Sequence, residues 1–163
     1  MNYQILDTPI GALRLVSNGT RLVKIDFDGR YAECEPDSNT VDPLLARAAD
    51  QLRQYFAGGR KCFDLPLAPA GTPFQRAVWA ALEDIPWGET RSYRDIAAAI
   101  GRPTAVRAVG AANGRNPLPL VVPCHRVVGS DGTLTGFAGG LAIKRRLLEL
   151  EGALAAGRDD FRH

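Results

Sequence analysis

The sequence predicts an α/β (α+β) fold in two parts, a small sheet with a helix followed by a largely helical region. Three short strand-like segments near the N-terminus indicate the sheet: residues 3–6, 11–16 and 22–27. After residue 72, apolar residues mostly recur at helical spacing. Between the two regions, prolines and small residues interrupt residues 65–71, which is typical of a linker. We therefore expect domains of residues 1–71 and 72–163.

The N-terminal region reads as a meander followed by one packing helix. Turn signals separate the strand-like segments: Thr8-Pro9, Asn18-Gly19 and Asp28-Gly29. Asp42 can cap a helix that has Pro43 in its first turn and ends before Gly58. Its apolar positions share one face: Leu45, Ala48, Leu52 and Phe56. Nothing in this region suggests catalysis.

The C-terminal region begins with a helix that Thr72 caps and Pro73 opens. Apolar residues then follow at helical spacing: Phe74, Val78, Leu82 and Ile85. Further on, a glycine-rich loop over residues 133–140 precedes a helix over residues 141–151. A flexible loop that carries an aromatic residue can form the wall of a pocket.

Two short helices joined at a glycine form a helix-turn-helix candidate. Ser92 and Asp95 can cap the first helix, Gly101 ends it, and Pro103 opens the second. Apart from Arg107, the second helix presents small or apolar side chains, so it has little with which to read base edges in a major groove. It is better suited to the minor groove, with one arginine projecting into the base stack. Alternatively, its alanines serve close packing between helices.

The charge is uneven along the chain, although the net charge is only +2. Residues 1–71 hold 8 basic and 9 acidic groups, whereas residues 72–163 hold 12 and 9. Six arginines lie between Arg91 and Arg126, with Asp95 as the single acidic residue. Arginine without lysine suits phosphate contact and stacking on bases. An ordinary solvated surface would account for the charge alone equally well.

The cysteines and the N-terminus indicate a cytoplasmic protein. The N-terminal residues show no secretion signal, and no apolar run is long enough to span a bilayer. The three cysteines are widely spaced without a C-x-x-C pair: Cys34, Cys62 and Cys124. We therefore expect free thiols rather than a disulfide framework or a structural zinc site, with Cys34 in a loop and Cys62 partly buried.

Cys124 is the first candidate for chemistry, because it follows the apolar run of residues 119–122 and precedes His125 and Arg126. A thiol at the end of a buried strand can be held rigidly, but its ordinary pKa of roughly 8.5 leaves few thiolates at neutral pH. His125 is the obvious base. Adjacent residues on an extended strand point to opposite faces, so a bridging water or a local bend is required.

Several spaced motifs, taken in order, resemble one known family. These are Ser92-Tyr93, Arg107-Ala-Val-Gly110, Asn116-Pro117, Pro123-Cys-His-Arg-Val127, Gly139-Gly-Leu141 and Glu151-Gly152. Together they resemble the methylated-DNA–protein-cysteine methyltransferases, the O6-alkylguanine-DNA alkyltransferases. The close resemblance covers residues 72–152, whereas residues 1–71 match in general layout. It implies a ribonuclease-H-like N-terminal domain and a winged-helix-like C-terminal domain.

The resemblance also implies roles for individual residues. Cys124 would be the alkyl acceptor, with His125 acting through a water, Glu151 bonded to the far side of the imidazole, and Asn116 ordering the strand. Some further residues would contact the DNA: Arg107 as the intercalating finger, Tyr93 beside the target phosphate and guanine, and Ala108 and Ala112 against the minor groove. Others would contact the flipped base: the carbonyls of Cys124 and Val127 at the guanine amino group, and the Ala138 amide at O6. Phe137 would form a wall of the pocket. Phe137 replaces an expected tyrosine and so removes one hydroxyl.

The implied reaction is DNA repair by direct transfer of an alkyl group from O6-alkylguanine in double-stranded DNA, after the nucleotide has been flipped out. A thioether product cannot regenerate the thiol, so each molecule should react once, without cofactor or metal. We expect a monomer without a membrane partner. Whether O4-alkylthymine is a substrate, how large an alkyl group fits, and whether molecules cluster on DNA stay open.

Two readings from other classes remain at this point. Alkyltransferase-like proteins bind lesions without repairing them, but they lack the cysteine. A cysteine hydrolase using Cys124 and His125 would need an oxyanion hole and a cleft that the sequence does not announce.

Overall fold

The computed structural model describes residues 1–27, 42–137 and 139–154. The chain divides into two compact units, Met1–Ala70 and Gly71–His163. The first contains a sheet and one helix, and the second contains four helices and a short strand pair among the described residues, so the predicted α/β class is confirmed. None of the helices in the described ranges has the length and apolar character needed to cross a bilayer.

The sheet of the first unit is a three-stranded antiparallel meander. Its strands are β1 (Asn2–Thr8), β2 (Gly11–Ser17) and β3 (Leu22–Phe27), in the order β1-β2-β3. Leu6 pairs with Leu13, and Leu15 pairs with Ile25, so buried aliphatic side chains from neighbouring strands meet on one face. The three predicted strands are therefore confirmed.

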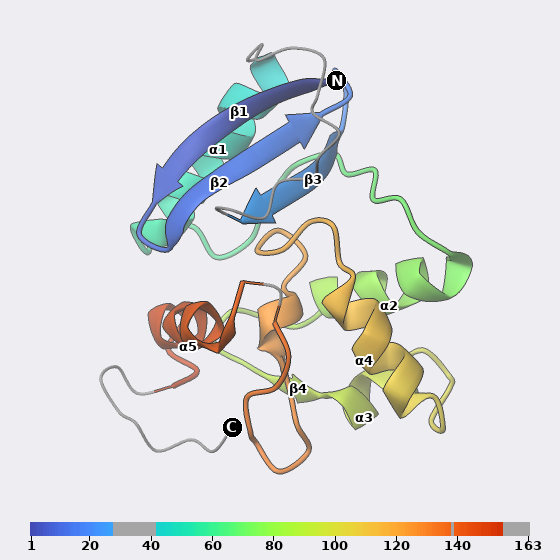
Figure 1. The fold of residues 1–163 in the computed structure, drawn as a ribbon. Helices are drawn as coiled ribbons and strands as arrows, with labels where there is room; N and C mark the ends of the chain where they lie inside the picture. The colour runs from blue at the N-terminus through green and yellow to red at the C-terminus, as the bar shows by residue number, and fades with distance from the viewer. Residues whose placement is uncertain (28–41, 138, 155–163) are drawn as a thin grey trace. The chain divides into compact units, whose positions relative to one another are not determined.

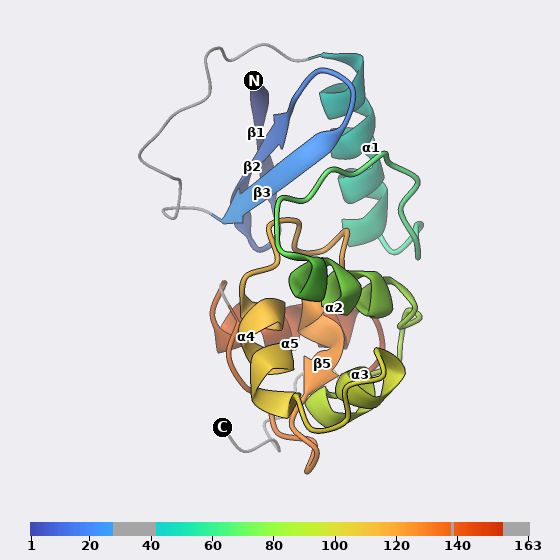
Figure 2. The same cartoon turned by 90° about the vertical axis from the view of Figure 1, so that its right-hand side faces the viewer.

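One helix, α1 (Pro43–Phe56), covers a face of this sheet (Figures 1 and 2). Asp42 caps it, since its side chain accepts a hydrogen bond of 2.8 Å from the Leu45 amide. Leu45, Ala48 and Leu52 are fully buried, as the predicted apolar face requires. The helix ends before Gly58, whose φ of +82° disfavours other residue types.

One prediction for this unit, the partly buried Cys62, is wrong. Within the predicted linker of residues 65–71, Leu67 forms an isolated parallel bridge with Leu22. The pairing uses the Pro66 carbonyl and the Ala68 amide, and the missing N–H of proline does not prevent it. Cys62 is a free thiol but exposed rather than partly buried, because it lies in a surface bend after α1. Cys34 lies outside the described residues.

The second unit packs helices around a two-stranded parallel pair. The helices are α2 (Pro73–Glu83), α3 (Tyr93–Ala99), α4 (Val106–Gly114) and α5 (Leu141–Leu150); the strands are β4 (Arg91–Ser92) and β5 (Val127–Val128). α4 packs against both α2 and α3 (Figure 2). The buried indole of Trp79 donates a 2.8 Å hydrogen bond to the Ala112 carbonyl, which ties α2 to α4.

The helix-turn-helix candidate is confirmed as two short helices, α3 and α4, with Gly101 at φ +74° between them. Ser92 and Asp95 form the predicted capping box. The second helix begins at Val106 rather than at Pro103, because the intervening residues form a turn closed by the bond from the Ala105 amide to the Arg102 carbonyl.

Candidate active site

Cys124 lies in a single turn of 3₁₀ helix, Cys124–Arg126, and not at the end of a strand. The amide of Arg126 donates to the Pro123 carbonyl at 3.0 Å, and the Val127 amide donates to the Cys124 carbonyl. The strand prediction for this stretch is therefore wrong. The chain therefore bends between Cys124 and His125, which is one of the two ways, a local bend or a bridging water, by which the sequence could join the thiol to the imidazole.

Asn116 braces the segment that leads into this turn. Its side-chain amide donates to the Val122 carbonyl at 2.8 Å, while its oxygen accepts from the Leu118 amide at 2.9 Å. A further bond from the Val122 amide to the Leu118 carbonyl closes the loop. At its tip Leu120 has a φ of +76°, the only positive φ among the described non-glycine residues. The apolar run of residues 119–122 is thus a tight buried loop.

The Cys124 thiol is buried, with 5% of the residue exposed. Burial raises its pKa to about 11, while a side-chain hydrogen bond from Asn116 and the charge of Lys144 act in the opposite direction. Few molecules would therefore carry the thiolate at neutral pH without a base. A nucleophilic role needs a group that can accept the thiol proton.

His125 is fully buried beside two charged side chains. Its Nε2 lies 2.7 Å from Oε2 of Glu151, the residue that ends α5. Arg126 donates to both oxygens of the same carboxylate, from Nε to Oε1 at 2.8 Å and from Nη2 to Oε2 at 3.0 Å. Its Nη1 donates to the Ile85 carbonyl at 2.6 Å. The structure thus brings Glu151 to the imidazole, and it adds Arg126, which sequence reasoning left without a role.

The other ring nitrogen of His125, Nδ1, has no hydrogen-bond partner among the described residues. Burial lowers the pKa of His125, and the nearby positive charges of Arg126 and Lys144 lower it further, against the effect of Glu151. The imidazole is then neutral, with its proton on Nε2 toward Glu151 and a lone pair on Nδ1. A neutral histidine in this tautomer can act as a general base through Nδ1.

Lys144 is a second residue that the sequence reading missed. It is fully buried on α5, and its ammonium donates 2.7 Å bonds to the carbonyls of Val127 and Thr135. Burial lowers its pKa to about 8, while the Cys124 thiolate acts to raise it. One signal was available in the sequence: Lys144 stands on the same helix face as Leu147, Leu148 and Glu151, where a lysine is unexpected.

Several predicted contact residues lie around the Cys124 turn. The hydroxyl of Thr135 donates to the Tyr93 hydroxyl at 2.9 Å, which joins α3 to the glycine-rich loop. Val127 is buried, and Phe137 in the loop is partly buried. The carbonyl of Cys124 accepts a long 3.4 Å bond from Asn113, a buried residue that sequence reasoning also missed. Ala138 lies outside the described residues.

The predicted DNA-facing residues on α4 differ in exposure. Arg107 and Ala108 are exposed, whereas Ala112 is buried and contributes to the helix packing. Three further arginines on or beside α3 and α4 are also exposed: Arg94, Arg102 and Arg115. The two helices and the turn between them therefore offer positive charge to solvent.

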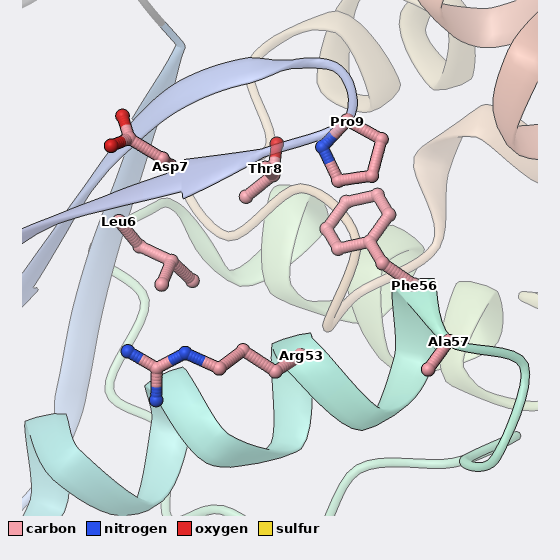
Figure 3. Close-up of a pocket in the computed structure, with 7 residues that line it drawn as sticks. All are labelled: Leu6, Asp7, Thr8, Pro9, Arg53, Phe56 and Ala57. Carbon is pink, nitrogen blue, oxygen red and sulfur yellow. The ribbon is translucent and has the colours of Figure 1, made fainter.

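A pocket of about 270 Å³ in the first unit is lined by no cysteine or histidine. Figure 3 shows its lining residues, which are Leu6, Asp7, Thr8, Pro9, Arg53, Phe56 and Ala57. The guanidinium of Arg53 pairs with Asp50 at 2.9 Å, and the Asp7 carboxylate points away from it. Among the described residues, no three histidine, cysteine or carboxylate side chains are grouped as metal ligands would be.

Comparisons with known proteins cover nearly the whole chain. Two family models match, both of 6-O-methylguanine DNA methyltransferase: the ribonuclease-like domain over residues 1–69 and the DNA binding domain over residues 73–153. The methylated-DNA–protein-cysteine methyltransferase of Methanosarcina barkeri is 50% identical over 153 residues, 93% of this chain and 97% of that protein. The constitutive enzyme of that name from Bacillus subtilis is 49% identical over 155 residues, 91% and 94% of the two chains.

Solved structures agree with these matches. The crystal structure of Mycobacterium tuberculosis OGT in complex with DNA has a TM-score of 0.86 and 47% identity, covering 94% of both chains. The O6-methylguanine DNA methyltransferase of Methanococcus jannaschii has a TM-score of 0.63 and 28% identity, over 98% of this chain and 99% of that one.

Proposed function

This chain belongs to the 6-O-methylguanine DNA methyltransferase family, and we propose that Cys124 is the residue that takes the alkyl group from O6-alkylguanine in DNA. The family places it among proteins that bind DNA and repair it by alkyl transfer to a cysteine. One observation carries the assignment to Cys124. Its buried turn also holds His125, whose Nε2 is engaged by Glu151 and whose Nδ1 is left unpartnered by the described residues.

The chemistry follows from this arrangement. The thiol proton of Cys124 passes through a water to Nδ1 of His125, and Glu151 stabilises the imidazolium that forms. The thiolate attacks the saturated alkyl carbon, so that the sulfur–carbon bond forms as the bond from that carbon to O6 breaks. Guanine leaves with the electron pair and regains a proton. Asn116 holds the loop before the turn, which fixes the sulfur for attack.

Access to a buried thiol requires the damaged nucleotide to leave the duplex, at a cost of about a few kcal/mol. We assign Arg107, exposed on α4, to the gap in the base stack, and Ala108 to close contact with the minor groove. Tyr93 stands at the entrance from α3, with its hydroxyl bonded to Thr135. The DNA complex of the mycobacterial relative supports binding of DNA by this scaffold.

The walls of the base pocket come from the turn and the glycine-rich loop. The carbonyls of Cys124 and Val127 each accept one described side-chain donor, from Asn113 and Lys144, and a carbonyl oxygen has two lone pairs. The Val127 carbonyl can therefore also accept from the guanine amino group, whereas the Cys124 carbonyl already accepts the Val127 amide and would take that amino group in place of the long bond from Asn113. We assign Phe137 to an aromatic wall of this pocket. No described group can cleave the thioether of alkylated Cys124, so we expect one turnover per molecule. We expect the protein to act in the cytoplasm, where chromosomal DNA is accessible.

The test is the mass of the Cys124 peptide after incubation with a duplex that carries one O6-methylguanine. Cys124→Ala is the negative control. Cys62→Ser is the matched control, because it removes an exposed thiol and leaves Cys124 in place. We expect one added methylene unit on the Cys124 peptide, limited to one per protein molecule, in wild type and in Cys62→Ser. DNA binding with an unchanged peptide mass would show a lesion-binding protein, and repeated turnover would point to a hydrolase.

A further inference from the structure

Arg126 donates three side-chain hydrogen bonds in the candidate site. Its guanidinium grips both oxygens of Glu151 in a fork, and its remaining nitrogen bonds the Ile85 carbonyl just after α2. Only 6% of Arg126 is exposed, so its positive charge is buried beside the carboxylate. Paired geometry of this kind makes a guanidinium–carboxylate contact both strong and directional.

The same carboxylate also faces His125, so two groups compete for its charge. Glu151 Oε2 receives the bond from Arg126 Nη2 at 3.0 Å and lies 2.7 Å from His125 Nε2. A lone buried carboxylate next to an imidazole favours the imidazolium, because the opposite charges attract at close range. A carboxylate already paired with arginine stabilises the imidazolium form of His125 much less.

The other charged groups around His125 act in the same direction as Arg126. Lys144, from α5, adds positive charge, and the Cys124 thiol in the same turn stays protonated at neutral pH. Among these groups, Glu151 is therefore the one that favours a protonated ring at neutral pH. Whether the His125 ring is neutral therefore depends on how far nearby positive charge offsets the negative charge of Glu151.

We propose that Arg126 is a positioning residue that keeps His125 neutral, and so able to accept the Cys124 proton, by balancing the charge of Glu151. This inference rests on the proposed role of His125 as the base. A residue that served structure alone would tie the turn to Ile85 and would leave the protonation of His125 unchanged. Arg126 instead sets the charge state in which His125 begins the reaction.

The experiment is an NMR titration of the ring nitrogens of His125 in the full chain without DNA. The sequence contains two histidines, His125 and His163, so a His125→Gln spectrum assigns both. In wild type we expect a neutral ring with the proton on Nε2 from pH 6 to pH 8. In Arg126→Gln, which keeps a hydrogen-bond donor and loses the charge, we expect the pKa of His125 to rise by about one unit or more, a tenfold change in the protonation equilibrium.

Two further variants separate charge from structure. Glu151→Gln combined with Arg126→Gln should return His125 to the neutral form, because the carboxylate is gone as well. Arg145→Gln is the matched control, since it removes an α5 guanidinium that pairs with Glu149, and it should leave the titration unchanged. The acidic limb of the rate of Cys124 alkylation by iodoacetamide should move to higher pH in Arg126→Gln, by the same shift as the pKa of His125.

An unchanged titration of His125 in Arg126→Gln would overturn the proposal, and so would a charged ring at pH 7 in wild type. If Arg126→Gln fails to fold, the wild-type spectrum and that of Arg126→Lys test the proposal instead. Lysine keeps the positive charge, so the His125 ring should stay neutral in Arg126→Lys. None of these readouts uses DNA. A neutral His125 in a protein that leaves O6-methylguanine untouched would therefore refute the repair function and not the role of Arg126.

Discussion

The buried ammonium of Lys144 donates a 2.7 Å hydrogen bond to the carbonyl of Val127, the residue that follows the Cys124 turn. A second bond of 2.7 Å reaches Thr135 in the glycine-rich loop. One side chain of α5 therefore joins the two segments that border the thiol. Among the described residues, the Cys124 thiolate is the group whose charge acts to raise the pKa of Lys144.

Lys144→Met should make Cys124 less reactive at neutral pH. The charge of Lys144 lowers the pKa of the thiol, so its removal should raise that pKa further above the ordinary value. A rise of about one unit would slow alkylation by iodoacetamide roughly tenfold below the thiol pKa. Lys61→Met, at an exposed position in the first unit, is the control. Equal rates for Lys144→Met and wild type at every pH would show that Lys144 does not act on the thiol.

The stability of the protein should rise between pH 7 and pH 9 because of Lys144. Below about pH 8 the lysine is protonated in both states, and the folded state bears the cost of burying it. Above that pH the folded chain loses the proton while the unfolded chain keeps it, so the free energy of unfolding increases. Burial of Cys124 acts against this as the pH rises through the ordinary pKa of a thiol, roughly 8.5, and it does so in wild type and in Lys144→Met alike.

Urea unfolding of wild type and Lys144→Met at pH 7, 8 and 9 measures this difference. The free energy of unfolding of wild type should gain about 1 kcal/mol on that of the variant over this range. A difference that stays constant from pH 7 to pH 9 would mean that the pKa of Lys144 is not lowered by burial.

Arg107→Ala should reduce repair of duplex DNA without changing the intrinsic reactivity of Cys124. The side chain is exposed on α4 and lies outside the hydrogen-bond network around the thiol. We expect alkyl transfer from a duplex that contains O6-methylguanine to fall by about tenfold or more, since filling the base stack offsets a few kcal/mol of flipping cost. Alkylation by iodoacetamide should be unchanged. The control is Arg53→Ala, which removes an arginine that pairs with Asp50 in the first unit. This variant should repair the duplex normally.

Ser92→Ala should destabilise the C-terminal unit by about 1 kcal/mol through loss of the capping box of α3. The Ser92 hydroxyl accepts from the Asp95 amide at 3.0 Å, and the Asp95 carboxylate accepts from the Ser92 amide at 2.9 Å. Hydrogen bonds from the backbone and side chain of Ser92 also lower the pKa of Asp95, so the variant should move that pKa toward its ordinary value. Thermal unfolding and carboxyl NMR shifts measure the two effects. Ser130→Ala, in an exposed turn, should change neither.

Local sequence signals predicted much of the fold, because they act within one turn of chain. The caps at Asp42, Thr72 and Ser92 form as expected, and each depends on a side chain and an amide three residues further on. The loop of residues 118–122 escaped prediction because Asn116 defines it from outside the apolar run. The 3₁₀ turn at Cys124 also escaped, since three residues are too few to show a period.

The candidate site was predictable as a set of residue types and not as a charge network. Cys124 and His125 are adjacent in sequence, and family resemblance supplied Glu151. The positions of Arg126 and Lys144 relative to Glu151 and Cys124 depend on how α5 packs across the turn, which no local pattern encodes. Arg126 looks like an ordinary surface charge in the sequence, and the position of Lys144 on an apolar helix face does not name its partners, although the structure buries both residues.

α5 carries Lys144 and Glu151 seven residues apart, and Glu151 still has helical backbone angles. Seven residues at about 100° each make nearly two full turns, so both side chains leave the helix in almost the same direction. A single inserted residue between them would rotate Glu151 by about 100°, away from His125, while Lys144 stayed in place. The number of residues between Lys144 and Glu151 thus fixes the direction of both side chains. A substitution between them keeps that number, whereas an insertion or deletion changes it and moves Glu151 away from His125.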